Sequence, residues 1–124
     1  MTTALLLIAH GSREAEANAD LLHVADQVRG RGNFAVVEPA FLELAEPTIM
    51  QAAQRCAASG VERVIIVPYF LSAGVHVRRD LEKHKDDLAR AFPKIGFQLA
   101  EPLGRSSLLV DLVMERATSV GRFR

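Results

Sequence analysis

Short apolar runs alternate with longer amphipathic stretches along the whole chain. Four runs rich in apolar and β-branched residues predict buried strands at residues 3–9, 33–41, 61–68 and 94–100. Between and after these runs, apolar residues recur at spacings of three and four, which is typical of a helix with one buried face. These stretches predict helices at residues 14–29, 47–59 and 75–92, and a last helix that begins at a cap on Ser106 or Ser107.

The predicted elements alternate between strand and helix, an order that indicates a parallel sheet with helices on both faces. Right-handed crossovers leave few topologies, and strand order 2-1-3-4 with two helices on each face is the most economical. We therefore expect one doubly wound, four-stranded α/β domain over residues 1–124, with a frayed tail at residues 121–124. The last helix would carry the apolar residues Leu108, Leu109, Leu112 and Val113.

Composition narrows the class of protein. The chain is 49% hydrophobic and 24% charged, as a globular domain should be, and its 15 basic and 15 acidic residues cancel. A nucleic-acid-binding protein would normally carry a basic excess, so no nucleic-acid partner is expected. The single cysteine, Cys56, excludes an intrachain disulfide and favours a reducing, cytoplasmic setting. No apolar run approaches the roughly 20 residues of a membrane span, so no membrane partner is expected.

Two histidines follow the two strands that flank the expected reversal of strand order. Ligands of open parallel sheets bind at the carboxyl ends of the strands beside that reversal, here between the first and third strands. His10 follows the first strand, where Gly11 lets the chain turn, and His76 follows the third strand at a helix start. Neutral imidazoles can bind a divalent metal or accept protons near neutral pH. Either histidine could instead be a structural or solvated residue, and His23 and His84 are expected on helix surfaces.

The neighbouring loops carry side chains that suit a large anionic ligand. Glu43, after the second strand, could be a base, a metal ligand or a solvated carboxylate, whereas Glu46 is placed to cap the next helix or to interact with its dipole. Arginines gather on these loops and helix starts, where they suit a ligand with several carboxylates or phosphates or are ordinary solvated side chains: Arg13, Arg78, Arg79 and Arg105. An apolar wall for a flat ligand, or ordinary strand-end packing, follows the third strand at Tyr69, Phe70 and Leu71.

Four motifs occur in a fixed order along the chain: residues 7–13 (LIAHGSR), 40–47 (AFLELAEP), 67–77 (VPYFL, then GVHV) and 102–104 (PLG). Together they resemble the short-form sirohydrochlorin chelatases of the CbiX type. The resemblance implies a chelatase-like, flavodoxin-like fold. It also implies insertion of a divalent metal (cobalt, iron or nickel) into a tetrapyrrole, in cobalamin or sirohaem biosynthesis. The sequence departs from the family at Ser72-Ala73 and at Ser106-Ser107, where the macrocycle should pack.

The resemblance also implies roles for particular residues. His10 and His76 match the metal-site histidines of the family. Glu43, from its place at the same edge and not from the resemblance, is expected to join them in catalysis. The metal would be a substrate, and no cofactor would be permanently bound. The tetrapyrrole would contact the residues of the same loops: Ser12, Arg13, Tyr69, Phe70, Leu71, Gly74, Arg78 and Arg79. Because short family members have half the length of two-domain chelatases, we expect a homodimer whose strand-edge loops face a shared cavity.

Two other hypotheses stay open on the sequence alone. A phosphoryl-transfer enzyme of the histidine-phosphatase kind would use His10 as its nucleophile, but that family has an arginine where Ala9 stands. A noncatalytic flavodoxin-like binding module would take up no metal and show no turnover.

Overall fold

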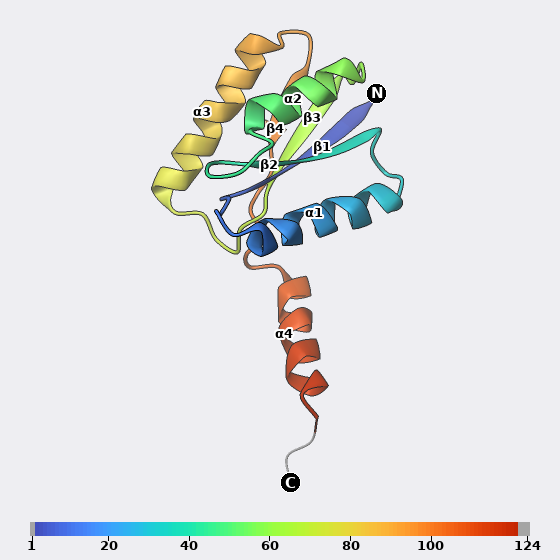
Figure 1. Ribbon diagram of the computed structural model, residues 1–124, viewed down its shortest axis with the longest axis vertical. Coiled ribbons are helices and arrows are strands. Elements are labelled where there is room, and N and C mark those ends of the chain that lie inside the picture. The colour runs from blue at the N-terminus through green and yellow to red at the C-terminus, as the bar shows by residue number, and fades with distance from the viewer. Residues whose placement is uncertain (1, 122–124) are drawn as a thin grey trace.

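The computed structural model describes residues 2–121, which form a four-stranded parallel sheet and four helices (Figure 1). The strands lie in the order β2-β1-β3-β4, as predicted. Most of the tail that we expected to be frayed, residues 122–124, lies outside the described part. In chain order the elements are β1 (Thr3–Ala9), α1 (Ala15–Gly30), β2 (Val36–Phe41), α2 (Ile49–Ala58), β3 (Arg63–Pro68), α3 (Val75–Ala91), β4 (Gly96–Leu99) and α4 (Ser107–Ser119).

The start of α2 differs from the prediction because a capping box fixes it two residues later. Thr48 is the N-cap: Gln51 N donates to Thr48 Oγ1 at 3.2 Å, and Thr48 N donates to Gln51 Oε1 at 2.8 Å. The expected capping role of Glu46 is therefore taken by Thr48. The Glu46 carboxylate instead accepts a hydrogen bond from Gln51 Nε2 at 2.8 Å.

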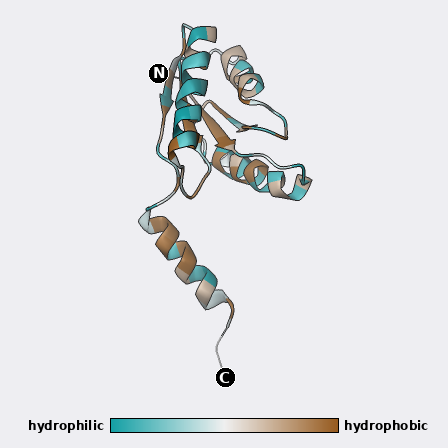
Figure 2. Ribbon diagram, turned by 90° about the vertical axis from the view of Figure 1, so that its left-hand side faces the viewer, coloured by the Kyte–Doolittle hydropathy of each residue, from teal (hydrophilic) through white to brown (hydrophobic). Residues whose placement is uncertain are grey.

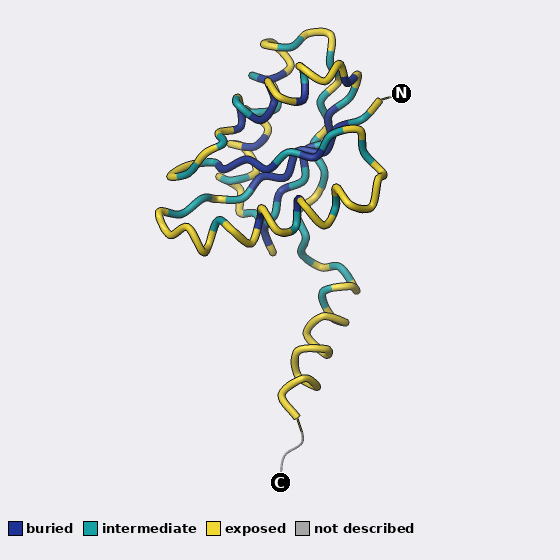
Figure 3. Tube along the Cα trace, turned by 45° about the vertical axis from the view of Figure 1, so that its right-hand side comes forward, coloured by how far each residue is buried: buried dark blue, intermediate teal, exposed yellow. Residues whose placement is uncertain are grey.

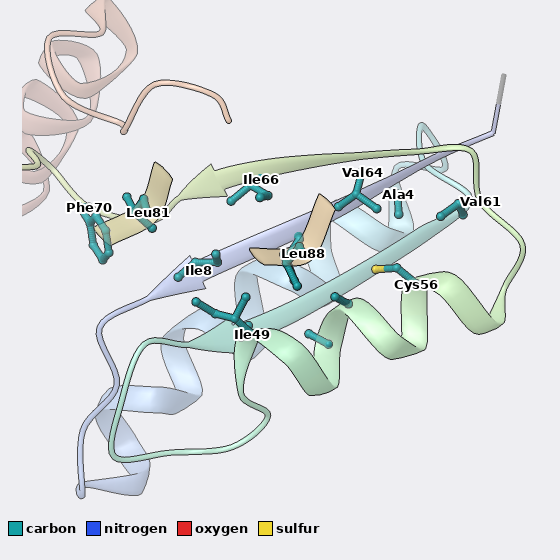
Figure 4. Close-up of a cluster of buried hydrophobic side chains, with 14 residues drawn as sticks. Ala4, Ile8, Ile49, Cys56, Val61, Val64, Ile66, Phe70, Leu81 and Leu88 are labelled. Carbon is teal, nitrogen blue, oxygen red and sulfur yellow. The ribbon is translucent and has the colours of Figure 1, made fainter. Parts of the chain in front are cut away.

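The core lies on both faces of the sheet because residues 4–8 of β1 are all buried. Alternate side chains point to opposite faces of a strand. Leu6 and Ile8 join a cluster with residues of α2 and α3, including Leu81 and Leu88 (Figure 4). On the other face, the remaining leucines of β1 pack with α1 in a smaller cluster of Leu5, Leu7, Leu21, Ala25, Val37 and Phe41.

The helices are not distributed two on each face, so that prediction was wrong. α2 and α3 cover one face, α1 covers the β2–β1 half of the other, and α4 projects away from the sheet (Figures 1 and 2). The apolar residues of α4 are mostly exposed (Figure 3): Leu108 is 75% exposed and Val113 is 66% exposed. In the described part of the chain, no helix is long and apolar enough to cross a membrane.

The segment before α4 explains why the helix leaves the sheet. Leu103 N donates to Phe70 O at 2.9 Å, which ties this segment to the loop after β3. Gly104 lies so close to the same loop that an added Cβ would stand 1.8 Å from Leu71 O. Arg105 then adopts a left-handed φ of 58°, and Ser106 caps α4 through a hydrogen bond from Leu108 N at 3.2 Å.

Candidate active site at the carboxyl edge of the sheet

Backbone hydrogen bonds join the loops that follow the four strands into one continuous edge. Glu43 N, after β2, donates to His10 O, after β1, at 3.0 Å. Tyr69 N, after β3, donates to Ile8 O of β1 at 2.7 Å. The loop after β4 is bound to the loop after β3 through the Leu103 hydrogen bond described above. The segments that carry the predicted site residues are therefore held at fixed positions relative to one another.

Gly11 is required by the close approach of the loops after β1 and β2. Its φ is 94°, in the left-handed region that glycine adopts without steric cost. An added Cβ would stand 1.8 Å from Glu43 O and 3.2 Å from the Phe41 Cβ. The backbone of Glu43 thus packs directly on the turn that follows His10, while the Glu43 side chain remains exposed.

His10 lies at the end of β1 with its side chain exposed and its ring against an aromatic partner. The ring centroids of His10 and Phe70 are 4.3 Å apart, and the ring planes are inclined by 32°. Phe70 is 7% exposed and packs into the cluster beside Leu81 (Figure 4). A side chain fixed in the core thus supports one side of the imidazole, while solvent reaches the other.

His76 lies in the first turn of α3, two residues after the N-cap Gly74, and is exposed. It lines an open hollow of about 440 Å³ together with Arg79, Asp80 and Lys83. His10 does not line this hollow, so the structure brings the two histidines to the same edge but not into one enclosed cavity. Within residues 2–121, no group of three or more His, Cys, Asp or Glu side chains could together hold a metal ion.

Ser12 uses its polar atoms to shape the turn between β1 and α1. Its Oγ accepts a hydrogen bond from Glu14 N at 3.0 Å. Its backbone is clasped by Asn18, whose Oδ1 accepts from Ser12 N at 2.9 Å and whose Nδ2 donates to Ser12 O at 2.7 Å. The sequence analysis missed Asn18. A signal was available, because asparagine is a poor helix former that often bonds to nearby backbone.

The predicted arginines fall into two groups. Arg78 is already paired: its Nη2 lies 3.4 Å from Glu101 Oε2, and its Nε donates to Ala73 O at 3.3 Å. Both partners of this ion pair are largely exposed. Arg13, Arg79 and Arg105 are exposed, and in the described part of the chain no carboxylate lies within ion-pair distance of any of them. These three are therefore the arginines available to an incoming anion.

A second hollow of about 470 Å³ joins the loops after β3 and β4. Its lining includes Leu71, Ser72, Arg78, Glu101 and Arg105. Ser72 belongs to one of the positions at which the sequence departs from the family pattern. A third hollow, of about 510 Å³, lies at the opposite edge, around Val61 before β3 and Ile95 before β4, and contains none of the predicted site residues.

The expected apolar wall is divided between the two faces of the sheet. Phe70 packs in the cluster under α2 and α3, whereas Tyr69 packs against the cluster under α1. Leu71 is 68% exposed and points to neither cluster. Alternation of side chains therefore continues past the end of β3, and of these three residues Phe70 is the one whose ring lies against His10.

The only cysteine in the sequence lies away from this edge, and its thiol is poorly reactive at neutral pH. Cys56 is fully buried in α2, within the larger core cluster (Figure 4). Burial, followed by the nearby Glu38 carboxylate, raises the pKa of the Cys56 thiol from 9.0 to about 11. At neutral pH the thiol is therefore protonated and is a poor metal ligand or nucleophile.

This chain matches one of the relatives below over nearly its full length and the other over half its length. The chain is 33% identical to the sirohydrochlorin cobaltochelatase of Methanopyrus kandleri, over 91% of this chain and 93% of that protein. It is 36% identical to the chloroplastic sirohydrochlorin ferrochelatase of Arabidopsis thaliana, over 90% of this chain and 50% of that protein. The chain thus spans about half the length of the plant relative.

Solved structures and a family model agree with these relatives. SirB from Bacillus subtilis with Fe³⁺ has a TM-score of 0.89 and 27% identity, over 99% of this chain and 49% of that chain. A CbiX protein from Marinobacter aquaeolei has a TM-score of 0.83 and 28% identity, over 94% of this chain and 95% of that chain. A family model described as CbiX matches residues 4–120. Because this match spans nearly the whole chain, the protein belongs to the CbiX family.

Proposed function

We propose that this chain is a sirohydrochlorin chelatase, which inserts a divalent metal ion into the tetrapyrrole and releases two protons. The family match over residues 4–120 carries the proposal, supported by a relative of similar extent that is named a sirohydrochlorin cobaltochelatase. Other relatives are named ferrochelatases, so Co²⁺ and Fe²⁺ are the first candidate metals, with Ni²⁺ third. Family membership favours this hypothesis over phosphoryl transfer and over a noncatalytic module.

The reaction requires both a metal ligand and a proton acceptor. A free-base macrocycle carries two inner N–H groups, and the metal forms its bonds to the ring nitrogens only as both protons leave. A neutral imidazole can bind the metal or accept a proton. His10 and His76 are assigned these two tasks. Two imidazoles leave coordination positions open for the ring nitrogens, as a metal that is a substrate requires.

The remaining side chains of the edge would hold and bend the macrocycle. Sirohydrochlorin carries several carboxylates, for which the exposed Arg13 and Arg79 are suitable partners. An exposed ion pair such as Arg78–Glu101 contributes only about 0–1 kcal/mol, so a substrate carboxylate can take the place of Glu101. Binding energy from these remote contacts can bend the ring and expose its nitrogen lone pairs. Glu43, exposed beside His10, would accept a proton or orient the incoming ion.

The functional unit in this proposal is a homodimer in the cytoplasm, binding a small-molecule substrate. A ligand site normally buries most of its ligand, whereas the hollows at this edge are open and both histidines are exposed. A second copy facing the first across a twofold axis would supply the missing wall. Light scattering should then give a mass near twice 13.6 kDa.

An absorbance assay tests the proposed activity directly. Sirohydrochlorin would be incubated anaerobically with Co²⁺, Fe²⁺ or Ni²⁺, with and without the full chain, and the spectral change on metal insertion would be followed. We expect the protein to accelerate insertion of at least one of these ions above the spontaneous rate. Equal rates with and without protein for all three ions would reject the proposal, and phosphatase activity with a phosphorylated His10 would establish the alternative.

A further inference from the structure

Two residues other than glycine adopt a left-handed backbone in the described part of the chain. Leu44 has a φ of 62° and Arg105 has a φ of 58°. This region is uncommon for residues with a Cβ, because the Cβ crowds a neighbouring carbonyl oxygen, whereas glycine and asparagine occupy it at lower cost. Strained residues of this kind gather at active sites and ligand clamps. We therefore asked what the side chains of Leu44 and Arg105 do.

Both strained residues lie at the carboxyl edge, one at each end of it. Leu44 follows β2 and Arg105 follows β4, which are the outer strands of the order β2-β1-β3-β4 (Figure 1). The segments after the inner strands, β1 and β3, carry His10 and His76. The two strained residues thus flank the candidate metal ligands from opposite ends of the sheet.

The side chain of Leu44 takes no part in the core. It is 53% exposed and belongs to neither buried cluster, although Leu42 packs against the larger cluster and Ala45 packs against the smaller one. An exposed leucine in a left-handed conformation carries two costs, the strain of its backbone and the apolar surface that it leaves in water. Asparagine at this position would reduce both costs.

The backbone of Leu44 is fixed beside the turn that carries His10. The preceding residue, Glu43, donates its N–H to His10 O at 3.0 Å. The carbonyl oxygen of Glu43 packs on Gly11, where an added Cβ would stand 1.8 Å from it. Leu44 follows directly on that carbonyl group. The turn therefore places an exposed apolar residue next to the exposed imidazole of His10.

Arg105 brings a free cation to the other end of the edge. It is exposed, and among residues 2–121 no carboxylate lies within ion-pair distance of its guanidinium. It lines the hollow of about 470 Å³ together with the exposed Leu71. Its backbone is held on both sides, because Gly104 packs on Leu71 O and the Ser106 hydroxyl caps α4. The strain at Arg105 is thus imposed by its neighbours and fixes where the guanidinium leaves the chain.

We infer that Leu44 and Arg105 are substrate-binding residues that hold the tetrapyrrole at the two ends of the edge. Leu44 packs on the apolar surface of the macrocycle beside His10, and Arg105 binds one of its peripheral carboxylates. This inference rests on the proposed function and adds two specific contacts to it.

The separation of the two residues matches a broad ligand. β2 and β4 are three strand spacings apart, which corresponds to about 14 Å. A small metabolite cannot contact both ends of such an edge at once, whereas a macrocycle with carboxylate side chains can. The chemistry of the pair also agrees with that ligand, because one residue offers an apolar surface and the other offers a bidentate donor for a carboxylate.

The inference predicts that affinity and stability change in opposite directions. Leu44→Asn and Arg105→Asn each introduce a residue that accepts a left-handed backbone more readily, and each removes the side chain that contacts the substrate. Substrate affinity should therefore fall while the stability of the fold is unchanged or higher. A residue with a purely structural role would instead lose stability when it is replaced.

Binding of metal-free sirohydrochlorin, followed by the change in its absorbance, measures affinity without a metal-insertion step. We expect each asparagine variant to raise the dissociation constant about tenfold, with a urea midpoint no lower than that of the wild type. Leu44→Met and Arg105→Lys should recover much of the lost affinity, because they retain the apolar side chain and the charge. High salt should shrink the effect of Arg105→Asn and leave that of Leu44→Asn, since only the first removes a charge.

Matched controls come from residues outside the carboxyl edge. Leu22 is 44% exposed in the middle of α1, and Arg31 is exposed at the C-cap of the same helix. Leu22→Asn and Arg31→Asn should leave the dissociation constant unchanged, which shows that loss of any exposed leucine or arginine is not sufficient.

The possible outcomes separate this inference from the proposed function. Dissociation constants that stay at the wild-type value in both asparagine variants would overturn the inference, and metal insertion by the wild-type chain would leave the chelatase proposal standing. Weaker binding that comes with a lower urea midpoint, or with a changed mass in light scattering, would assign Leu44 and Arg105 a structural role and also overturn the inference. A wild-type chain that neither binds sirohydrochlorin nor accelerates insertion would reject both.

Discussion

Replacing Gly11 by alanine should damage both the stability of the fold and the candidate site. At a φ of 94° alanine costs about 1–2 kcal/mol that glycine does not. The new Cβ would also stand 1.8 Å from Glu43 O, where real Cβ contacts stay beyond 3.0 Å. Relief of this overlap requires the loops after β1 and β2 to separate, which weakens the Glu43 N to His10 O hydrogen bond, worth about 1 kcal/mol. We expect Gly11→Ala to lower the free energy of unfolding by about 2–4 kcal/mol.

A second glycine provides the control for backbone strain alone. Gly32 has a φ of 73°, but an added Cβ would meet no atom within 4 Å. Gly32→Ala should therefore cost about 1 kcal/mol or less, because reduced freedom of the unfolded chain offsets part of the strain. Urea unfolding followed by circular dichroism gives both free energies.

The rate of metal insertion then tests whether the contact between Gly11 and the Glu43 backbone positions His10. A displacement of His10 by about 1 Å can lower a rate about 10²-fold, so folded Gly11→Ala should be slow and Gly32→Ala should keep the wild-type rate. If Gly11→Ala is as stable as Gly32→Ala and equally active, the packing of Glu43 on this turn does not position His10.

Measurements at three further positions test the fold away from the site. Leu88→Ala, at a side chain that is 1% exposed between α3 and the sheet, should cost about 2–5 kcal/mol in urea unfolding, and a cost below 1 kcal/mol would contradict the packing shown in Figure 4. Thr48→Ala should cost about 1 kcal/mol by removing the cap of α2, whereas Thr48→Ser should retain most of that stability. The native Cys56 thiol should resist alkylation near neutral pH and react only on unfolding, because its pKa is raised from 9.0 to about 11. Since the folded-state pKa is the higher one, the free energy of unfolding should fall as pH rises from 9.0 to about 11, and Cys56→Ala should reduce this dependence.

The alternation of elements and the strand order followed from the hydrophobic pattern, because a parallel sheet with right-handed crossovers leaves few arrangements. The edge that collects His10, Glu43 and His76 followed from the same topology. The capping box of α2 was missed, although its signal is local, since Thr48 and Gln51 have the required spacing of three. These features depend on local sequence or on simple topological rules.

The features that the sequence did not reveal depend on contacts between distant segments. Periodicity identified α4 as a helix but not its direction away from the sheet, because the restraint lies in the contact of Gly104 with Leu71 O. The split between Tyr69 and Phe70 follows from a strand alternation that continues beyond Pro68, where we had expected a loop. The two hydrogen bonds between the Asn18 side chain and the Ser12 backbone were not predicted, because they depend on the three-dimensional turn between β1 and α1.

The central claim, that His10 and His76 carry metal insertion at the carboxyl edge, is tested most directly by initial rates of cobalt insertion into sirohydrochlorin. The comparison uses the wild-type chain, His10→Ala, His76→Ala and His23→Ala, whose exposed histidine on α1 serves as the control. We expect the first two variants to be slower by about 10²–10⁴-fold while remaining folded and dimeric, and His23→Ala to match the wild type. Near-wild-type rates in both His10→Ala and His76→Ala would contradict the assignment.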